Sequence, residues 1–168
     1  MELGTLGQFG FLTLPNYSLI ACANAIEALR MANRVSARAA YKWQLLTLDG
    51  VPARASNGMS LQPTASLGTA RAFDIVFVCG GVDIRRSTGR GVLSALRRLA
   101  REHVPLGALC TGSFALAGPA CSRATVVPSI GKTWLRSARN FPTSSFSTIS
   151  IRSIASALPA PAASRRWI

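Results

Sequence analysis

The hydrophobic positions of the first 117 residues alternate between short continuous runs and segments with helical spacing. The continuous runs predict buried strands, because each is short and is closed by turn-forming residues; they lie at residues 9–14, 41–48, 73–81 and 104–110. Residues 55–63 fit a short strand or an edge hairpin. The run at 73–81 is the strongest, and its continuous apolar centre is typical of a parallel strand covered on both faces.

The first predicted helix spans residues 19–33. Apolar side chains recur there every three or four positions, at Leu19, Ala23, Ile26 and Leu29. Ser18 precedes this segment, and serine is a favoured residue for capping the first turn of a helix. The sequence therefore predicts an amphipathic helix that packs one face against the strands.

The second predicted helix spans about residues 91–102. Its inward positions are Val92, Leu93, Leu96 and Leu99, and its arginines are expected to point to solvent, at Arg97, Arg98 and Arg101. A further helix is expected directly after residue 110. Because strands and helices alternate in this way, the order predicts an α/β sandwich around a mostly parallel sheet.

Two of the predicted strands end in residues suited to a ligand site, at the edge where open α/β sheets bind ligands. Gly80 and Gly81 follow one strand and would let a ligand approach the backbone closely. Cys110 follows another, expected to be central, and stands at a strand-to-helix turn that has the nucleophile-elbow pattern. We expect Cys110 to face the two glycines, and the residues alone leave it open whether this thiol is reactive or simply a small buried side chain.

Longer stretches carry a resemblance to a known family. "FDIVFVCGG" and, further along, "GALCTGSFALA" resemble the ThiJ/PfpI superfamily, which has the class I glutamine amidotransferase-like fold. "FGFLTLPNYSLIACANAIEALRMANR" and "YKWQLLTLDGVPARASNGMSL" narrow the resemblance to the N-terminal domain of AraC-type transcription regulators. The resemblance covers residues 8–117. It implies a flavodoxin-like three-layer sandwich with a mostly parallel sheet, incomplete at the C-terminus.

The resemblance also implies which residues of this chain form the ligand pocket. Cys110 matches the nucleophile of the enzymatic members, and Gly80, Gly81 and the Thr111 N–H match the backbone groups that bind an oxyanion. These four residues are therefore the expected ligand pocket, with Cys110 as the candidate nucleophile position.

The catalytic partners of that nucleophile are missing at the matching positions. Enzymatic members place an acidic residue from the first helix beside the thiol, where this chain has Ala21 or Cys22, and Glu27 lies more than a turn further on. They also place a histidine after the next strand, whereas the one histidine here, His103, precedes the strand that ends at Cys110. The usual activation of the thiol is therefore not expected.

The function implied by the resemblance is a ligand-sensing, non-catalytic domain of an AraC-type regulator, without the helix-turn-helix half. Regulators of this group commonly control the catabolism of small nitrogenous compounds such as amino acids and quaternary amines, so the expected partner is a small-molecule metabolite effector. A homodimer is expected in the intact family, and specific DNA binding by this chain is not. The alternative is a cysteine-dependent hydrolase of the ThiJ/PfpI type, an amidase, peptidase or glyoxalase-like enzyme that uses Cys110.

The charge of the chain is strongly positive and unevenly placed. Nineteen basic and six acidic residues give a formal net charge of +13, which is typical of proteins with an anionic partner such as nucleic acid. All six acidic residues precede Cys110, whereas residues 111–168 contain seven basic residues and no acidic one. Because the excess is concentrated in the last third, a basic nucleic-acid binder is the weaker interpretation.

That last third differs from the rest in composition. Pro119 ends the helix after Cys110, so we expect a partial sensor domain at residues 1–118 and a basic Ser/Pro/Arg-rich tail at 119–168. The tail could be disordered or could be an arm for nucleic acid. A third hypothesis, translation of a GC-rich gene in a shifted frame after about residue 118, accounts for the missing acids and for a truncated chain.

Other classes of site find no support in the sequence. The four cysteines are far apart, and no Cys/His spacing suits zinc; they are Cys22, Cys79, Cys110 and Cys121. No cofactor is predicted, no apolar run is long enough to cross a membrane, and the first residues lack the features of a signal peptide. A reduced, cytoplasmic protein is expected.

Overall fold

The computed structural model describes residues 7–70 and 72–117, so the predictions for the tail at 119–168 concern residues outside the described part of the chain. The described elements follow the predicted alternation of strands and helices. In chain order they are β1 (Gln8–Thr13), α1 (Leu19–Ser36), β2 (Lys42–Thr47), β3 (Ala65–Ser66), β4 (Ile75–Cys79), α2 (Ile84–Ser87), α3 (Arg90–Arg101), β5 (Leu106–Leu109) and α4 (Ser113–Leu116).

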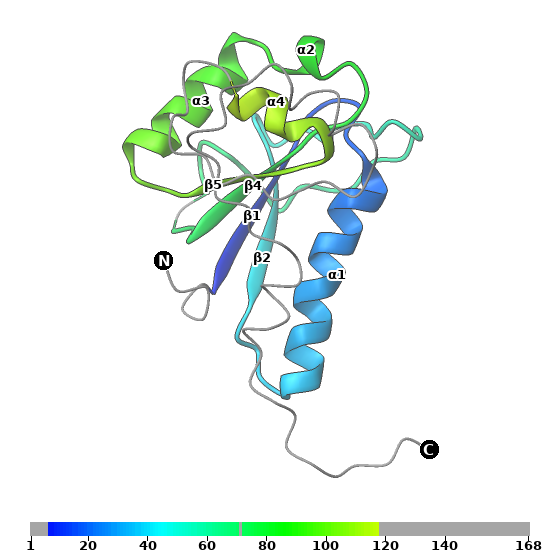
Figure 1. Cartoon of the computed structure of the whole chain (residues 1–168), viewed down its shortest axis with the longest axis vertical. Coiled ribbons are helices and arrows are strands. Elements are labelled where there is room, and N and C mark those ends of the chain that lie inside the picture. The colour runs from blue at the N-terminus through cyan, green and yellow to red at the C-terminus, as the bar shows by residue number, and fades with distance from the viewer. Residues whose placement is uncertain (1–6, 71, 118–168) are drawn as a thin grey trace.

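The strands form one parallel sheet in the order β3-β2-β1-β4-β5. Phe9 of β1 pairs with Trp43 of β2 on one side and with Ile75 of β4 on the other. Helix α1 covers one face of the sheet, while α3 and α4 cover the opposite face (Figure 1). This arrangement confirms the predicted flavodoxin-like three-layer sandwich.

Both faces of the sheet are apolar, which explains why the central strands lack alternation. On the α1 face, the rings of Phe9 and Phe11 stack against Phe77, with centroids 6.5 Å and 5.6 Å away. On the other face, Leu96 and Leu99 of α3 are buried against β4 and its neighbours. Burial of each such leucine contributes about 1.5–3 kcal/mol, so packing rather than helix propensity fixes α3.

Helix α1 begins where the sequence indicates. The Ser18 hydroxyl accepts a hydrogen bond from the Ala21 N–H at 3.4 Å, which confirms the predicted cap. The helix continues three residues beyond residue 33, to Ser36, and the residue that caps it, Ala37, is left-handed. Its fully buried positions also differ from the expected set, because Cys22 and Ala32 join Leu29 while the other expected residues are only partly buried.

Three local features differ from the sequence predictions. Residues 55–63 form a turn closed by a single antiparallel bridge between Arg54 and Ser60, and the strand beside β2 is instead β3. The short helix α2 was not predicted. Arg98 is not directed only to solvent, because its guanidinium donates a hydrogen bond to the Leu67 carbonyl at 3.1 Å.

Candidate functional site

The chain turns sharply where β5 ends, at the C-terminal edge of the sheet. Leu109 is extended and buried, whereas Cys110 has a φ of 54° and opens a 3₁₀ turn, Cys110–Gly112, that leads into α4. A left-handed conformation costs a residue other than glycine about 1–2 kcal/mol, so the surrounding structure must hold Cys110 in place. The thiol-bearing residue is partly exposed, as the elbow pattern predicts.

The turn after β4 holds this elbow from one side. The Gly80 N–H donates to the Leu109 carbonyl at 3.2 Å, and the Thr111 hydroxyl donates to the Gly81 carbonyl at 2.6 Å. A Cβ atom on Gly80 would overlap the backbone nitrogen of Gly112. The structure thus brings together all four residues of the expected pocket: Gly80, Gly81, Cys110 and Thr111.

The loop between β1 and α1 closes the same junction from the other side. The Ser18 N–H donates to the Gly80 carbonyl at 2.9 Å, and the Val82 N–H donates to the Asn16 carbonyl at 3.0 Å. A side chain on Gly81 would overlap that Asn16 carbonyl. Close backbone packing therefore explains why both positions are glycine. The Gly80 N–H already donates to the Leu109 carbonyl, so it is not free to bind a ligand.

Two buried thiols lie behind the elbow. Cys22 of α1 and Cys79 of β4 are 0% and 1% exposed, and both belong to the core cluster on the α1 face of the sheet. The neighbouring Cys79 thiol lowers the pKa of Cys22, while burial raises the pKa of Cys79 well above its usual range. Within residues 7–70 and 72–117 the cysteines are free thiols, and Cys121 lies outside these residues.

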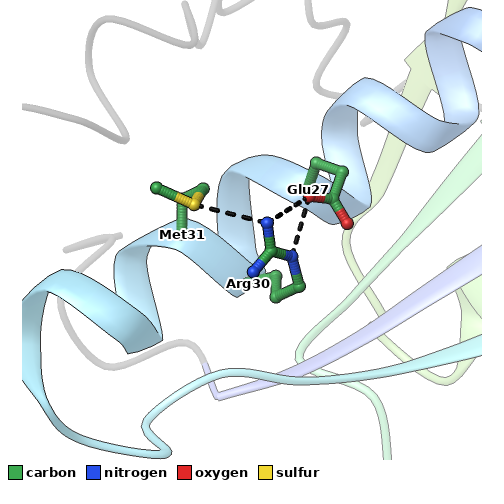
Figure 2. A network of polar contacts seen from close by, with 3 residues as sticks. All are labelled: Glu27, Arg30 and Met31. Carbon is green, nitrogen blue, oxygen red and sulfur yellow. Dashed lines mark hydrogen bonds and ion pairs between the residues drawn. The ribbon is translucent and has the colours of Figure 1, made fainter.

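The carboxylate that would serve an enzyme is not beside the thiols. Cys22 occupies the buried position of the first turns of α1, and Glu27 lies on the exposed side of the helix. Arg30 forms an ion pair with Glu27 at 2.6 Å and also donates to the sulfur of Met31 at 3.4 Å (Figure 2). The hydrogen bond from Arg30 lowers the pKa of Glu27.

The histidine also lies where the sequence indicates. His103 is exposed in the turn between α3 and β5, whereas Cys110 follows the opposite end of β5. The strand therefore separates the two residues, and β5 is the edge strand of the described sheet rather than a central one. The expectation that Cys110 ends a central strand is thus wrong for the described residues.

A cavity of about 620 Å³ lies at the same edge of the sheet, next to the ends of β1 and β2. Its walls come from three parts of the chain: the end of β1 and its loop, the loop after β2, and the segment from Asp83 through the start of α3. None of the four expected pocket residues lines it. The only features of the sequence that point to this cavity are the turn residues Pro15-Asn16 and Asp49-Gly50, which follow the two strands.

Residues 7–70 and 72–117 hold no group of three or more His, Cys, Asp or Glu side chains that could bind a metal ion. Among these residues, no helix is long and apolar enough to span a membrane.

Comparison with protein families gives one match, the DJ-1/PfpI family, over residues 18–139. Curated relatives include the HTH-type transcriptional regulators GbdR and CdhR of Pseudomonas aeruginosa. They are 50% and 40% identical to this chain over 110 residues, which is 66% of the chain but 30% and 32% of the relatives. The chain thus matches about a third of the length of these relatives.

Solved structures give the same picture of the fold. An AraC family transcriptional regulator from Pseudomonas putida superposes with a TM-score of 0.57 and 26% identity, over 66% of this chain and 68% of that one. A DJ-1 superfamily protein from Agrobacterium tumefaciens, Atu0886, superposes with a TM-score of 0.62 over 91% of this chain and 90% of that one. Its identity is 15%, so this second likeness concerns the fold alone.

Proposed function

This chain belongs to the DJ-1/PfpI family, and we propose that it is the ligand-sensing, non-catalytic domain of an AraC-type transcription regulator. The regulators GbdR and CdhR support the proposal because they are 50% and 40% identical to this chain over 110 residues. In the regulator as a whole, DNA binding would belong to a helix-turn-helix part, and this chain would not bind a specific DNA sequence. The protein would act in the cytoplasm, as a homodimer.

The observation that carries the non-catalytic part of the proposal is the isolation of the Cys110 thiol. Within residues 7–70 and 72–117, no imidazole or carboxylate is hydrogen-bonded to it. A thiol nucleophile is ordinarily activated by an adjacent base that a third group orients. Here the position that matches the acid carries Ala21 or Cys22, and His103 lies beyond the other end of β5.

The effector of this domain would be a small nitrogenous metabolite, bound at the C-terminal edge of the sheet. The elbow residues Gly80, Gly81, Cys110 and Thr111 form part of that edge, because backbone and side-chain hydrogen bonds join the turn after β4 to the elbow. Arg85 of α2 stacks on the Phe114 ring of α4 at 5.2 Å, so the helix that follows the elbow is in contact with α2.

One observation favours a second candidate, a cysteine-dependent hydrolase. Cys110 is held in a left-handed conformation at a strand-to-helix turn and is partly exposed, which is the backbone arrangement that presents a nucleophile. The lack of an activating partner among the described residues makes this the weaker candidate.

Thermal unfolding with a panel of metabolites tests the proposal. Small nitrogenous compounds should include at least one that raises Tm by about 5 °C or more at saturation, because a ligand at about 100 times its Kd stabilises by about 2.7 kcal/mol. Sugars and nucleotides serve as comparison classes. A panel in which no nitrogenous compound raises Tm, while the folded protein unfolds cooperatively, would overturn the sensor assignment.

A further inference from the structure

A row of exposed arginines runs along the outer side of α3. This arginine row consists of Arg90, Arg97 and Arg101, whose spacing of seven and four residues places them within about 40° of one another around the helix axis. The buried side chains of α3 lie on the opposite side of the helix. We propose that the arginine row binds the phosphate backbone of duplex DNA without reading its bases.

The three arginines have no ionic partner in the described part of the chain. Among residues 7–70 and 72–117 the ion pairs join Arg30 to Glu27 and Arg98 to Glu102, so the arginine row is not neutralised. A solvent-exposed helix face usually carries charges of both signs, which keeps its own repulsion small. This face carries one sign only.

The row is also unfavourable for the helix that carries it. Arg97 and Arg101 are four positions apart, where like charges destabilise a helix. Arg90 is the first residue of α3, and the first turn contains no acidic residue to match the positive end of the helix dipole. A row that breaks two local rules of helix stability, with no compensating contact among the described residues, indicates a surface kept for an anionic partner.

The neighbouring residues strengthen the positive field. Six of the twelve basic residues in residues 1–110 fall between Arg85 and Arg101. The acidic residues that flank this segment are Asp83 and Glu102, and the Glu102 carboxylate lies 4.0 Å from Arg98. Such an excess attracts a polyanion over a distance of about 8–10 Å at physiological salt.

The dimensions of the row suit a duplex backbone. From Arg90 to Arg101 the helix rises about 16 Å, and duplex DNA carries one phosphate charge per about 1.7 Å of its axis. Several phosphates therefore lie within reach of three long side chains, and guanidinium groups bind phosphates with two parallel hydrogen bonds. Contacts with phosphates position a protein on DNA but carry no sequence information.

Duplex DNA is the polyanion that the proposed function brings to this surface, and the inference rests on that function. GbdR and CdhR are HTH-type transcriptional regulators. A helix-turn-helix part joined to this domain would hold a duplex nearby and raise its effective concentration, so that weak contacts with phosphates suffice. An acidic protein segment is the competing partner, and the experiment below distinguishes it from DNA.

Fluorescence anisotropy of the full chain with a labelled duplex of about 20 base pairs tests the proposal over a salt series. R90Q/R97Q/R101Q should weaken binding about tenfold or more at about 50 mM salt. The dependence of log K on log salt should become less steep by about 2–3, because each phosphate contact contributes about 0.9.

A second triple variant removes the same charge from another place. R34Q/R38Q/K42Q is the matched control, because these residues are exposed and lie around the end of α1 and the start of β2. Its salt dependence should change by less than about 1. Circular dichroism checks folding, and R97Q and R101Q as single variants should each lower the slope by about 0.9 if the triple variant does not fold.

Three results would overturn the inference. An equal loss of DNA binding in both triple variants would mean that only net charge matters. Unchanged salt dependence in the variant of the arginine row would place the DNA contacts elsewhere in the chain. Binding of a poly-L-glutamate peptide that this variant loses, with DNA binding unchanged, would make an acidic protein the partner. None of these measurements involves a metabolite, so the sensor function stands or fails separately, on the Tm panel.

Discussion

Gly80 and Gly112 lie in backbone contact, at the point where the turn after β4 meets the elbow after β5. A Cβ atom on Gly80 would overlap the Gly112 nitrogen, and one on Gly112 would overlap the Val78 carbonyl. The atoms that these Cβ positions would meet belong to the backbone, so no flexible side chain can move aside to make room. This contact fixes the position of the Cys110 backbone relative to the end of β4.

Replacement of Gly80 by alanine should therefore destabilise the protein. G80A is expected to lower the free energy of unfolding by about 1–3 kcal/mol, the usual cost of forcing atoms into a packed site. G68A is the matched control, because Gly68 is exposed and its Cβ position would meet only the Ser66 hydroxyl, at 3.8 Å. Urea unfolding curves measure both, and equal stabilities for the two variants would contradict the packing argument.

The strained backbone at Cys110 predicts a difference between two substitutions. C110G and C110A both remove the thiol, but only glycine adopts a φ of 54° without steric cost. We expect C110G to be the more stable of the two by about 1 kcal/mol, measured by urea unfolding. An alanine variant as stable as the glycine variant would mean that Cys110 is not left-handed in solution.

The buried thiols predict a loss of stability at alkaline pH. Because burial raises the pKa of Cys79, this group stabilises the fold below the unfolded thiol pKa of about 8.5, and its contribution is lost as pH rises toward the folded pKa. The lowered pKa of Cys22 acts in the opposite direction, but two neighbouring thiolates in the core would repel each other, so the pair resists full ionisation. Stability should fall by about 1–2 kcal/mol between about pH 8 and about pH 10.

A double variant provides the control for that pH dependence. C22A/C79V removes both titrating groups, so its stability should fall less over the same range, with a reductant present throughout. Parallel pH profiles for the wild type and the double variant would show that other groups cause the change.

The positive charge predicts weak DNA binding without sequence preference. With a net charge of +13, the chain should bind any duplex through its phosphates, and the affinity should fall steeply as salt rises. Fluorescence anisotropy with two unrelated duplexes of equal length should give Kd values within about twofold of each other at each salt concentration. A strong preference for one duplex at physiological salt would contradict the proposal that this chain lacks specific DNA binding.

Much of the fold follows from local patterns in the sequence. The strand at Ile75–Cys79 is buried on both faces, and so its five residues are all apolar. Ser18 marks the start of α1, because a helix needs an acceptor for its first N–H groups. The elbow at Cys110 can also be predicted from the sequence, because small residues directly follow an apolar strand.

The remaining features depend on contacts between distant segments. Helix α2 is a single turn whose start, Asp83, is left-handed, so it has no hydrophobic period to detect. The contact between Cys22 and Cys79 joins a helix and a strand more than fifty residues apart, and the helical pattern did not single out Cys22 as buried. The cavity likewise has walls from three segments, none of which carries a recognisable motif.

If this domain binds its ligand without converting it, mass spectrometry should find no product after incubation of the protein with that ligand. Purified wild-type protein and C110S are incubated with each ligand that raises Tm, together with glutamine, a peptide and methylglyoxal as substrates of the alternative function. Every compound should be recovered chemically unchanged with both proteins. A product that accumulates beyond one equivalent with the wild type and is absent with C110S would contradict it, because Cys110 would then be a working nucleophile.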